Sequence, residues 1–312
     1  RFEVLNEPHG VFNDQPALWD AYLADALAVI RVQHPHRVVL AGPVRWNSIA
    51  ALDSFNPPAD PYLVLTVHHY EPFAFTHQGA TWVDPVPPVG VVWTGDLYGF
   101  ADGWQDWSWG TQLAGTADGL AVSYVQGWAG LQFKSDRVLG DVTRLRIRTD
   151  RPMRLSIAVG SDAGEARFEV LPDAGAVEHV LDVPAGLPVD RVVLQNATPD
   201  AQPTFVVGSV ELDRVGGETV SLVMSERQAI DAAMASAAAW AGDREMRVNL
   251  GEFGAFSTAD MASRAVWTRA VRRAAESNGI GWTYWELAAG FGLYDPDADA
   301  WRAPLLDALV GE

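Results

Sequence analysis

Residues 2–8, FEVLNEP, are a short apolar run that ends in Asn6-Glu7-Pro8. Pro8 lacks a backbone N–H and stops a strand, so Glu7 must lie at the end of a strand or at its edge. A second run, MRVNLGEFG at residues 246–254, ends in a similar way, with Gly251 and Gly254 on either side of Glu252. We therefore predict two strands that each present a glutamate at their carboxyl end.

Helical and extended patterns alternate outward from these two runs. Apolar residues at helical spacing predict helices, and short β-branched runs predict strands. The predicted helices are 16–33, 48–54, 226–241, 261–277 and 303–309, and the further predicted strands are 37–41, 62–67 and 281–285. Such alternation is typical of a parallel (β/α) barrel, whose functional side chains lie at the carboxyl ends of its strands. Only five strands are predicted, fewer than the eight of a complete barrel.

Residues 95–217 interrupt this pattern. They contain short segments of alternating hydrophobicity between glycine, aspartate and proline, at 120–125, 145–148, 155–159, 191–194 and 205–207. A period of two bounded by turn residues predicts an antiparallel β-sandwich. The interruption is long enough to form its own core. We therefore predict a discontinuous partial barrel, 1–94 with 218–312, and an inserted sandwich domain, 95–217.

Composition limits the ligands that this chain can bind. The 312 residues carry a formal net charge of −18, which disfavours nucleic acid and acidic polysaccharides and favours a neutral ligand. Thirteen tryptophans supply flat rings suited to stacking on sugars, although most are expected in the core. The chain has no cysteine, no apolar stretch long enough to span a bilayer and no nucleotide-binding motif. We expect no metal and no cofactor.

Two carboxylates on two strand ends are the minimum that hydrolysis of a glycosidic bond requires. One carboxyl group protonates the leaving oxygen, and the other attacks the sugar or activates water. The ordinary alternative for Glu7 or Glu252 is a solvated glutamate at a strand end. Pro8, Gly251 and Gly254 favour the catalytic interpretation, because they fix the strand end and allow the backbone to approach closely.

Several motifs in this order resemble glycoside hydrolase family 5, and within it the bacterial endo-β-1,4-glucanases. The resemblance covers about two thirds of the chain. The motifs are NEP (6–8), VHHYEPF (67–73), FTHQGATW (75–82), GEFG (251–254) and WTYWE (282–286). The resemblance implies a (β/α)8 barrel of which the chain holds strands 4 to 8, with the first three units before Arg1 and the insert between strands 6 and 7.

The resemblance also implies a role for each site residue. Glu7 would be the general acid/base and Glu252 the nucleophile of a retaining double displacement, with carboxyl groups about 5 to 5.5 Å apart. Asn6 would bind the sugar 2-hydroxyl, Tyr70 would hydrogen-bond Glu252, and His68 would orient Glu7. The remaining substrate-binding candidates are aromatic platforms, Trp285 beneath the reacting sugar and Trp46 for a further glucose. Since adjacent strand residues face opposite sides, only one of His68 and His69 can point into the site.

The insert is similar to jelly-roll carbohydrate-binding modules at residues 102–110 and 127–131. Its candidates for binding a glycan are Trp104, Trp107, Trp109 and Trp128; the alternative is a structural insert in which these rings are buried. The resemblance implies a neutral β-glucan as the partner and secretion as the localisation. From the charge and the lack of a long apolar stretch we expect no contact with nucleic acid or membrane. Alternatives are a mannanase, a xyloglucanase or a β-glucosidase on the same frame, or a non-catalytic glycan-binding fragment.

Overall fold

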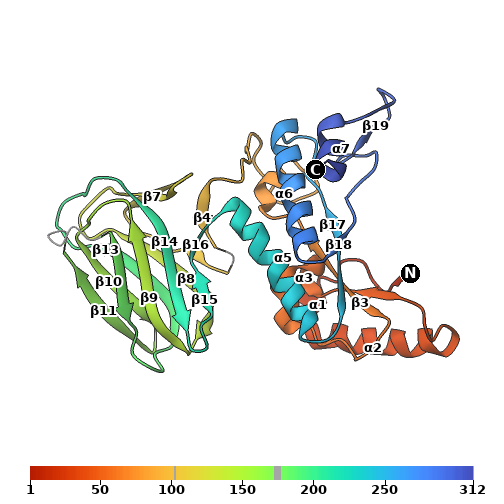
Figure 1. The fold of residues 1–312 in the computed structure, drawn as a ribbon, viewed down its shortest axis with the longest axis horizontal. Coiled ribbons are helices and arrows are strands. Elements are labelled where there is room, and N and C mark those ends of the chain that lie inside the picture. Colours follow the sequence, from red (N-terminus) through yellow and green to blue (C-terminus); the bar gives the residue numbers. More distant parts are fainter. Residues whose placement is uncertain (102, 172–176, 312) are drawn as a thin grey trace. The chain divides into compact units, whose positions relative to one another are not determined.

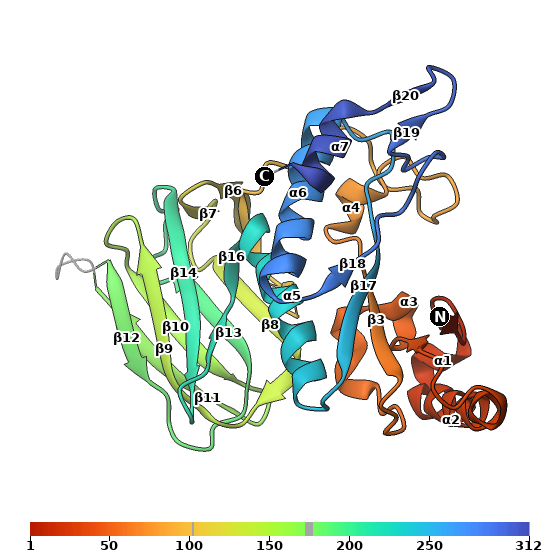
Figure 2. The same cartoon turned by 45° about the vertical axis from the view of Figure 1, so that its right-hand side comes forward.

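The computed structural model describes residues 1–101, 103–171 and 177–311 and is drawn in Figures 1 and 2. Asp102, the first residue of the tryptophan-rich run at 102–110, lies outside the described residues. Contacts divide the chain into two units, Arg1–Gly95 with Ile230–Glu312, and Asp96–Ala229. Within the described residues, no helix has the length and apolar character needed to cross a membrane.

A five-stranded parallel sheet forms the centre of the first unit. Its order is β1 (Phe2–Glu3), β2 (Val39–Ala41), β3 (Leu63–His69), β17 (Arg247–Phe253) and β18 (Gly281–Trp282). Every residue of β3 is buried, as expected of a strand covered on both faces. The sheet is open among the described residues, with β1 at one edge and β18 at the other. The fold is therefore mixed α/β, and the described part forms no closed barrel.

Helices cover this sheet. They are α1 (Val11–Asp14), α2 (Pro16–Gln33), α3 (Val44–Asn47), α4 (Phe73–Thr76), α5 (Glu226–Gly242), α6 (Met261–Ser277) and α7 (Ala303–Val310). Figures 1 and 2 show α5 and α6 running alongside β17. The core joins Trp19 of α2, Leu65 of β3 and Trp267 of α6.

The helix expected over 48–54 is instead a 3-10 helix, η1 (Ile49–Ser54). A short hairpin, β19 (Tyr294–Asp295) and β20 (Ala300–Trp301), precedes α7.

The second unit contains two antiparallel sheets. One has the order β11 (Gly164–Val170), β10 (Leu155–Ser161), β13 (Val189–Asn196), β8 (Gly130–Leu139) and β5 (Gln105–Asp106). The other has the order β12 (Glu178–Asp182), β9 (Val142–Thr149), β14 (Phe205–Arg214), β7 (Gly119–Tyr124) and β6 (Thr111–Thr116). One hydrophobic cluster draws residues from both sheets, among them Leu145, Ile157 and Leu194.

The second unit extends past the expected end of the insert at Gly217. Gly216 and Gly217 have positive φ and lie in the turn between β14 and β15 (Thr219–Ser221), which pair. The strand β16 (Val223–Ser225) then pairs with β4 (Tyr98–Phe100). Glycine adopts the left-handed backbone that a tight hairpin turn needs, so this glycine pair belongs to a turn inside the unit.

Candidate active site

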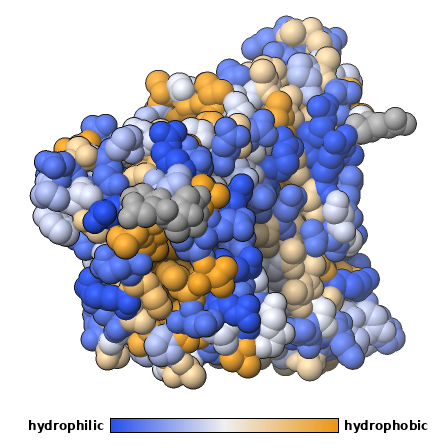
Figure 3. All heavy atoms as spheres, turned by 60° about the vertical axis from the view of Figure 1, so that its left-hand side comes forward, coloured by the Kyte–Doolittle hydropathy of each residue, from blue (hydrophilic) through white to orange (hydrophobic). Residues whose placement is uncertain are grey.

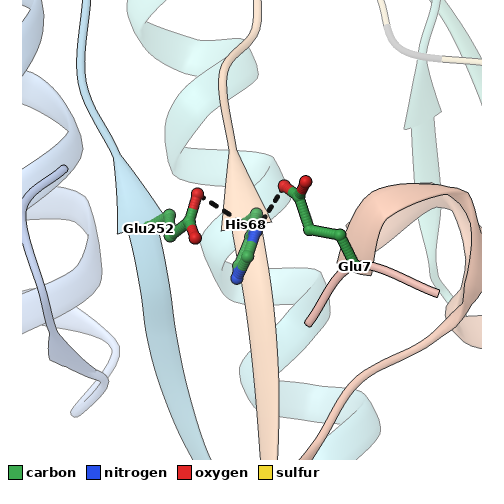
Figure 4. A group of neighbouring side chains, drawn as sticks. All are labelled: Glu7, His68 and Glu252. Atoms are coloured by element: carbon green, nitrogen blue, oxygen red, sulfur yellow. Dashed lines mark hydrogen bonds and ion pairs between the residues drawn. The ribbon is translucent and has the colours of Figure 1, made fainter. Parts of the chain in front are cut away.

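The structure brings Glu7, His68 and Glu252 together, as Figure 4 shows. The Nδ1 atom of His68 lies 2.8 Å from Oε1 of Glu7 and 3.5 Å from Oε2 of Glu252. One ligand atom from each of the three side chains lies within 4.8 Å of the other two. The two carboxylates therefore face each other across one imidazole nitrogen.

A β-bulge in β17 places Glu252 beside His68. The pairing of β17 with β3 shifts between Leu250 and Glu252, so that Glu252 is paired with His68. Gly251 is the extra residue, and a Cβ on it would collide with Oγ1 of Thr66. A bulge re-aims a side chain at the end of a strand, and only glycine fits this one without displacing Thr66.

Tyr70 and Asn6 hold the Glu252 carboxylate. The Tyr70 hydroxyl donates to Oε2 of Glu252 at 2.8 Å, and the Asn6 side chain also hydrogen-bonds Glu252. Burial raises the pKa of Glu252, while His68, Tyr70 and Asn6 oppose that rise by stabilising its charge. Burial and the charge of Glu252 raise the pKa of Tyr70 above its usual range, so Tyr70 remains a donor. Glu252 is thus a half-buried carboxylate with its own set of donors.

The two adjacent histidines have different surroundings. His68 points toward the carboxylates, whereas the His69 ring stacks on Trp267 at 6.2 Å between ring centroids. Burial lowers the pKa of His69 to about 4, so the ring is neutral near pH 7. His69 is therefore a packing residue of the core.

Sequence reasoning missed Asn47, which is fully buried behind His68. Its Nδ2 lies 3.2 Å from Nε2 of His68. Asn47 ends a left-handed turn, in which Arg45, Trp46 and Asn47 have φ of 57°, 58° and 57°. The turn is held by bonds from the Arg45 amide to Oδ1 of Asn13 and from the Trp46 amide to the Pro8 carbonyl. Asparagine tolerates this conformation better than most residues, which was the one signal in the sequence.

Glu3 was also missed. Its side chain hydrogen-bonds Asn47, and its pKa is raised, chiefly by burial. Glu3 lies four residues before Glu7, at the end of β1. A third carboxyl group therefore lies behind the pair and contacts the side chain that supports His68.

The aromatic candidates of the first unit are exposed. The Trp46 ring is 51% accessible and stacks on His9 with 5.1 Å between ring centroids. Trp285 is 46% accessible, and its backbone N–H donates to the Phe253 carbonyl at 2.9 Å, which ties it to the end of β17. Both rings can therefore reach a ligand.

The tryptophans of the second unit differ from one another. Trp107, Trp109 and Trp128 are exposed, but Trp104 is only 9% accessible and belongs to the hydrophobic core. The sequence interpretation of Trp104 as a glycan-binding residue is therefore wrong, because a buried ring cannot stack on a ligand. The strand β4, which precedes Trp104 in the chain, contributes the partly buried Phe100 to the same core.

Glu7, His68 and Glu252 also have the donor types of a metal site. Among the described residues, they form a group whose ligand atoms lie close enough together to hold an ion. Nδ1 of His68 already bonds to Glu7, and Nε2 faces Asn47. Hydrogen bonds therefore account for both nitrogens of the imidazole.

One family model matches part of the chain. Residues 1–107 match the family described as Cellulase (glycosyl hydrolase family 5). Endoglucanase H of Acetivibrio thermocellus is 36% identical over 106 residues, which are 34% of this chain and 11% of that protein. Endoglucanase 3 of Fibrobacter succinogenes is 37% identical over 86 residues, which are 27% of this chain and 13% of that protein.

Among solved structures, one described as an endoglucanase is 25% identical, with a TM-score of 0.56. The match covers 100% of this chain and 59% of that one. The chain thus spans about three fifths of that solved relative and a far smaller share of the curated ones.

Proposed function

We propose, from the resemblance of this chain to the cellulases of glycoside hydrolase family 5, that it belongs to a retaining glycosidase that cleaves β-1,4-glucan. The observation that carries the proposal is the approach of Glu7 and Glu252, whose facing oxygens lie within 4.8 Å of each other. Inverting enzymes keep their two carboxyl groups about 6.5 to 9.5 Å apart to admit a water, whereas retaining enzymes hold them at about 5 to 5.5 Å.

In the first step of this mechanism, Glu252 attacks the anomeric carbon and Glu7 protonates the oxygen of the departing sugar. The glycosyl group is then bonded to Glu252. In the second step Glu7 takes a proton from water, the water attacks the anomeric carbon, and Glu252 leaves as a carboxylate. Tyr70 and Asn6 hold Glu252 during both steps, and the Nδ1–H of His68 holds Oε1 of Glu7, which leaves Oε2 to exchange the proton.

We assign the five parallel strands to positions four to eight of a (β/α)8 barrel, as the family resemblance implies. A hollow of about 630 Å³ beside the edge strand β1 supports this assignment, because Phe2, Val4, Val29 and Ile30 contribute apolar side chains to it. An apolar surface of this kind at a sheet edge is usually covered by a further element. An extracellular site of action belongs to the same proposal.

The open sheet favours a second candidate function, a glycan-binding protein without catalysis. Among enzymes, mannanase, xyloglucanase and β-glucosidase activities use the same pair of glutamates, and the loops between the motifs set the choice. Hydrolysis assays on soluble cellulose, mannan and xyloglucan separate these possibilities.

The decisive experiment replaces the nucleophile. We expect Glu252→Ala to reduce hydrolysis of an aryl β-cellobioside below about a hundredth of the wild-type rate. Azide should restore turnover, because a small anion fits the space of the lost carboxylate and attacks in its place. Glu178→Ala, which removes an exposed glutamate of β12, is the matched control and should leave the rate unchanged. Full activity in Glu252→Ala would refute the mechanism, and wild-type binding without hydrolysis would favour the non-catalytic candidate.

A further inference from the structure

The second unit has a groove on the outward face of the sheet that contains β8, β10, β11 and β13. Side chains alternate along a strand, so the residues between the core positions point outward. Ala158 and Val193 form the floor and are only 4% and 8% accessible, although they face away from the core. The groove has a volume of about 390 Å³. The face of the molecule drawn in Figure 3 has both hydrophilic and hydrophobic residues.

The groove runs across the strands. Arg167 is paired with Ala158, Ala158 with Val193, and Val193 with Gln132, in one row from β11 to β8. Adjacent strands lie about 4.8 Å apart, so this row extends over about 14 Å. The length suits several linked sugars better than a single one.

Trp109 forms one wall of the groove and is seated on Gly130. The two residues exchange backbone hydrogen bonds at 3.0 and 2.9 Å. A Cβ on Gly130 would collide with the six-membered ring of Trp109, so the ring lies over the glycine backbone. The indole Nε1–H donates to the carbonyl of Trp128 at 2.9 Å. The ring is therefore fixed, its donor is satisfied, and 38% of the residue stays accessible.

The polar side chains of the groove leave it with little net charge. Arg191 pairs with Asp162 and Glu165, and Arg167 also pairs with Glu165. Gln195 donates from Nε2 to the Trp128 carbonyl, which leaves its Oε1 free to accept. Amide groups beside a flat apolar ring suit a neutral ligand rich in hydroxyl groups, and paired arginines do not favour a phosphate or a sulfate.

We propose that this groove binds a segment of a neutral β-linked glucan, with a sugar ring stacked on Trp109 and hydroxyl groups bonded to Gln132 and Gln195. The choice of a glucan rests on the proposed function of the first unit. Trp107 lies two residues before Trp109 and is also exposed. Its amide donates to the Gln132 carbonyl, so the chain is paired with β8 here, and residues two apart along a paired strand share a face. It extends the aromatic wall along the edge.

Binding is measured on the full chain, with no turnover required. Native gels that contain barley β-glucan report retardation, and calorimetric titration with cellohexaose reports affinity. We expect Trp109→Ala to weaken binding at least about tenfold, the usual loss for an aromatic anchor. The double variant Gln132→Ala/Gln195→Ala should weaken it as well. Trp301→Ala removes an exposed tryptophan of the β19–β20 hairpin and is the matched control, with unchanged binding.

Trp285→Ala separates the two possible sites. Binding that survives Trp285→Ala and is lost in Trp109→Ala belongs to the groove and supports the proposal. Equal binding by the wild type, Trp109→Ala and the glutamine double variant would overturn it, as would a folded wild type that binds no β-glucan. Circular dichroism of each variant verifies the fold. Hydrolysis is assayed separately. A wild type that hydrolyses β-glucan but does not bind it in the groove refutes only this inference, and a wild type that binds in the groove without hydrolysis refutes only the proposed function.

Discussion

The two ring nitrogens of His68 face different partners, and this difference determines which nitrogen carries the proton. Nδ2 of Asn47, an N–H donor, lies 3.2 Å from Nε2, so Nε2 accepts and the ring proton is on Nδ1. Nδ1 then donates to Glu7 at 2.8 Å. Asn47 is therefore a positioning residue, because it acts on the carboxyl pair only through His68.

Removing the Asn47 amide should disturb the imidazole and not the binding of substrate. We expect Asn47→Ala to lower kcat about tenfold to a hundredfold with little change in KM, since misplacing a reacting group has effects of this size. The ¹⁵N resonances of His68 should show mixed tautomers in the variant and one tautomer in the wild type. Asn56→Ala changes an exposed asparagine and serves as the control. A single unchanged tautomer in Asn47→Ala would contradict this role.

Glu252 should reduce stability at neutral pH. Its pKa is raised from an ordinary value of 4.5, chiefly by burial, so its contribution to the free energy of unfolding is present below pH 4.5 and is lost as the pH rises through the higher folded-state pKa. Glu252→Gln should therefore raise Tm at pH 7, and the gain should shrink below pH 4.5. Thermal unfolding of Glu252→Gln and of the exposed control Glu178→Gln measures this. A gain that does not depend on pH would rule out the electrostatic cause.

The bulge in β17 makes the geometry of the Glu7–Glu252 pair depend on one glycine, Gly251. In a regular ladder, Gly251 would be paired with His68 and Glu252 with His69. Because successive residues face opposite sides, Glu252 would then leave the face that His68 occupies. The bulge corrects this register within a single residue.

Gly251→Ala tests the bulge. The new methyl group would collide with Thr66, so we expect a loss of about 1–3 kcal/mol in the free energy of unfolding, as for other overpacked sites. Gly281→Ala is the matched control, because a Cβ there meets its nearest neighbour, Oδ1 of Asn249, at an ordinary 3.7 Å. Urea denaturation gives both values. Thr66→Ala should recover part of the loss in the double variant, and additive effects would show that the two residues do not interact.

The sequence predicted the long elements well and the irregular ones poorly. The helix at 16–33 has the predicted bounds, because Pro16 fixes its first turn and the apolar spacing extends over five turns. The strand at 281–285 keeps only two residues, since beyond Trp282 single bonds from the Thr283 and Trp285 amides replace a regular ladder. Periodicity also could not reveal Asn47, because a left-handed turn has no apolar repeat. The nearness of Glu7 and Glu252 was predictable because both were expected at the carboxyl edge of one parallel sheet, although β1 ends at Glu3, four residues before Glu7.

The second unit has the organisation of an independently folding domain. Its sheets share a core of their own, and its strand pairs lie within residues 96–229. The last core residues, Leu222 and Val223, lie beyond the glycine pair at 216–217 and are buried. Where the unit ends along the chain therefore decides whether its core is complete.

A comparison of two fragments tests this. We expect residues 96–229 expressed alone to unfold cooperatively with an enthalpy of about 90 kcal/mol near 60 °C, as for other domains of this length. Residues 96–217 should unfold at a lower temperature, because they lack β15, β16 and two buried core residues. Scanning calorimetry measures both. Equal transitions would show that β15 and β16 contribute nothing to the unit.

The left-handed turn at residues 45–47 has a consequence for the thermodynamics of ligand capture. Each non-glycine residue in this conformation carries about 1–2 kcal/mol of strain, and the bonds to Asn13 and Pro8 maintain it. The Trp46 ring, stacked on His9, is thus ordered in advance. We propose Trp46 as a platform for a sugar. A sugar stacked there would lose its own freedom without having to immobilise the tryptophan, so the entropic penalty of association would fall mainly on the ligand.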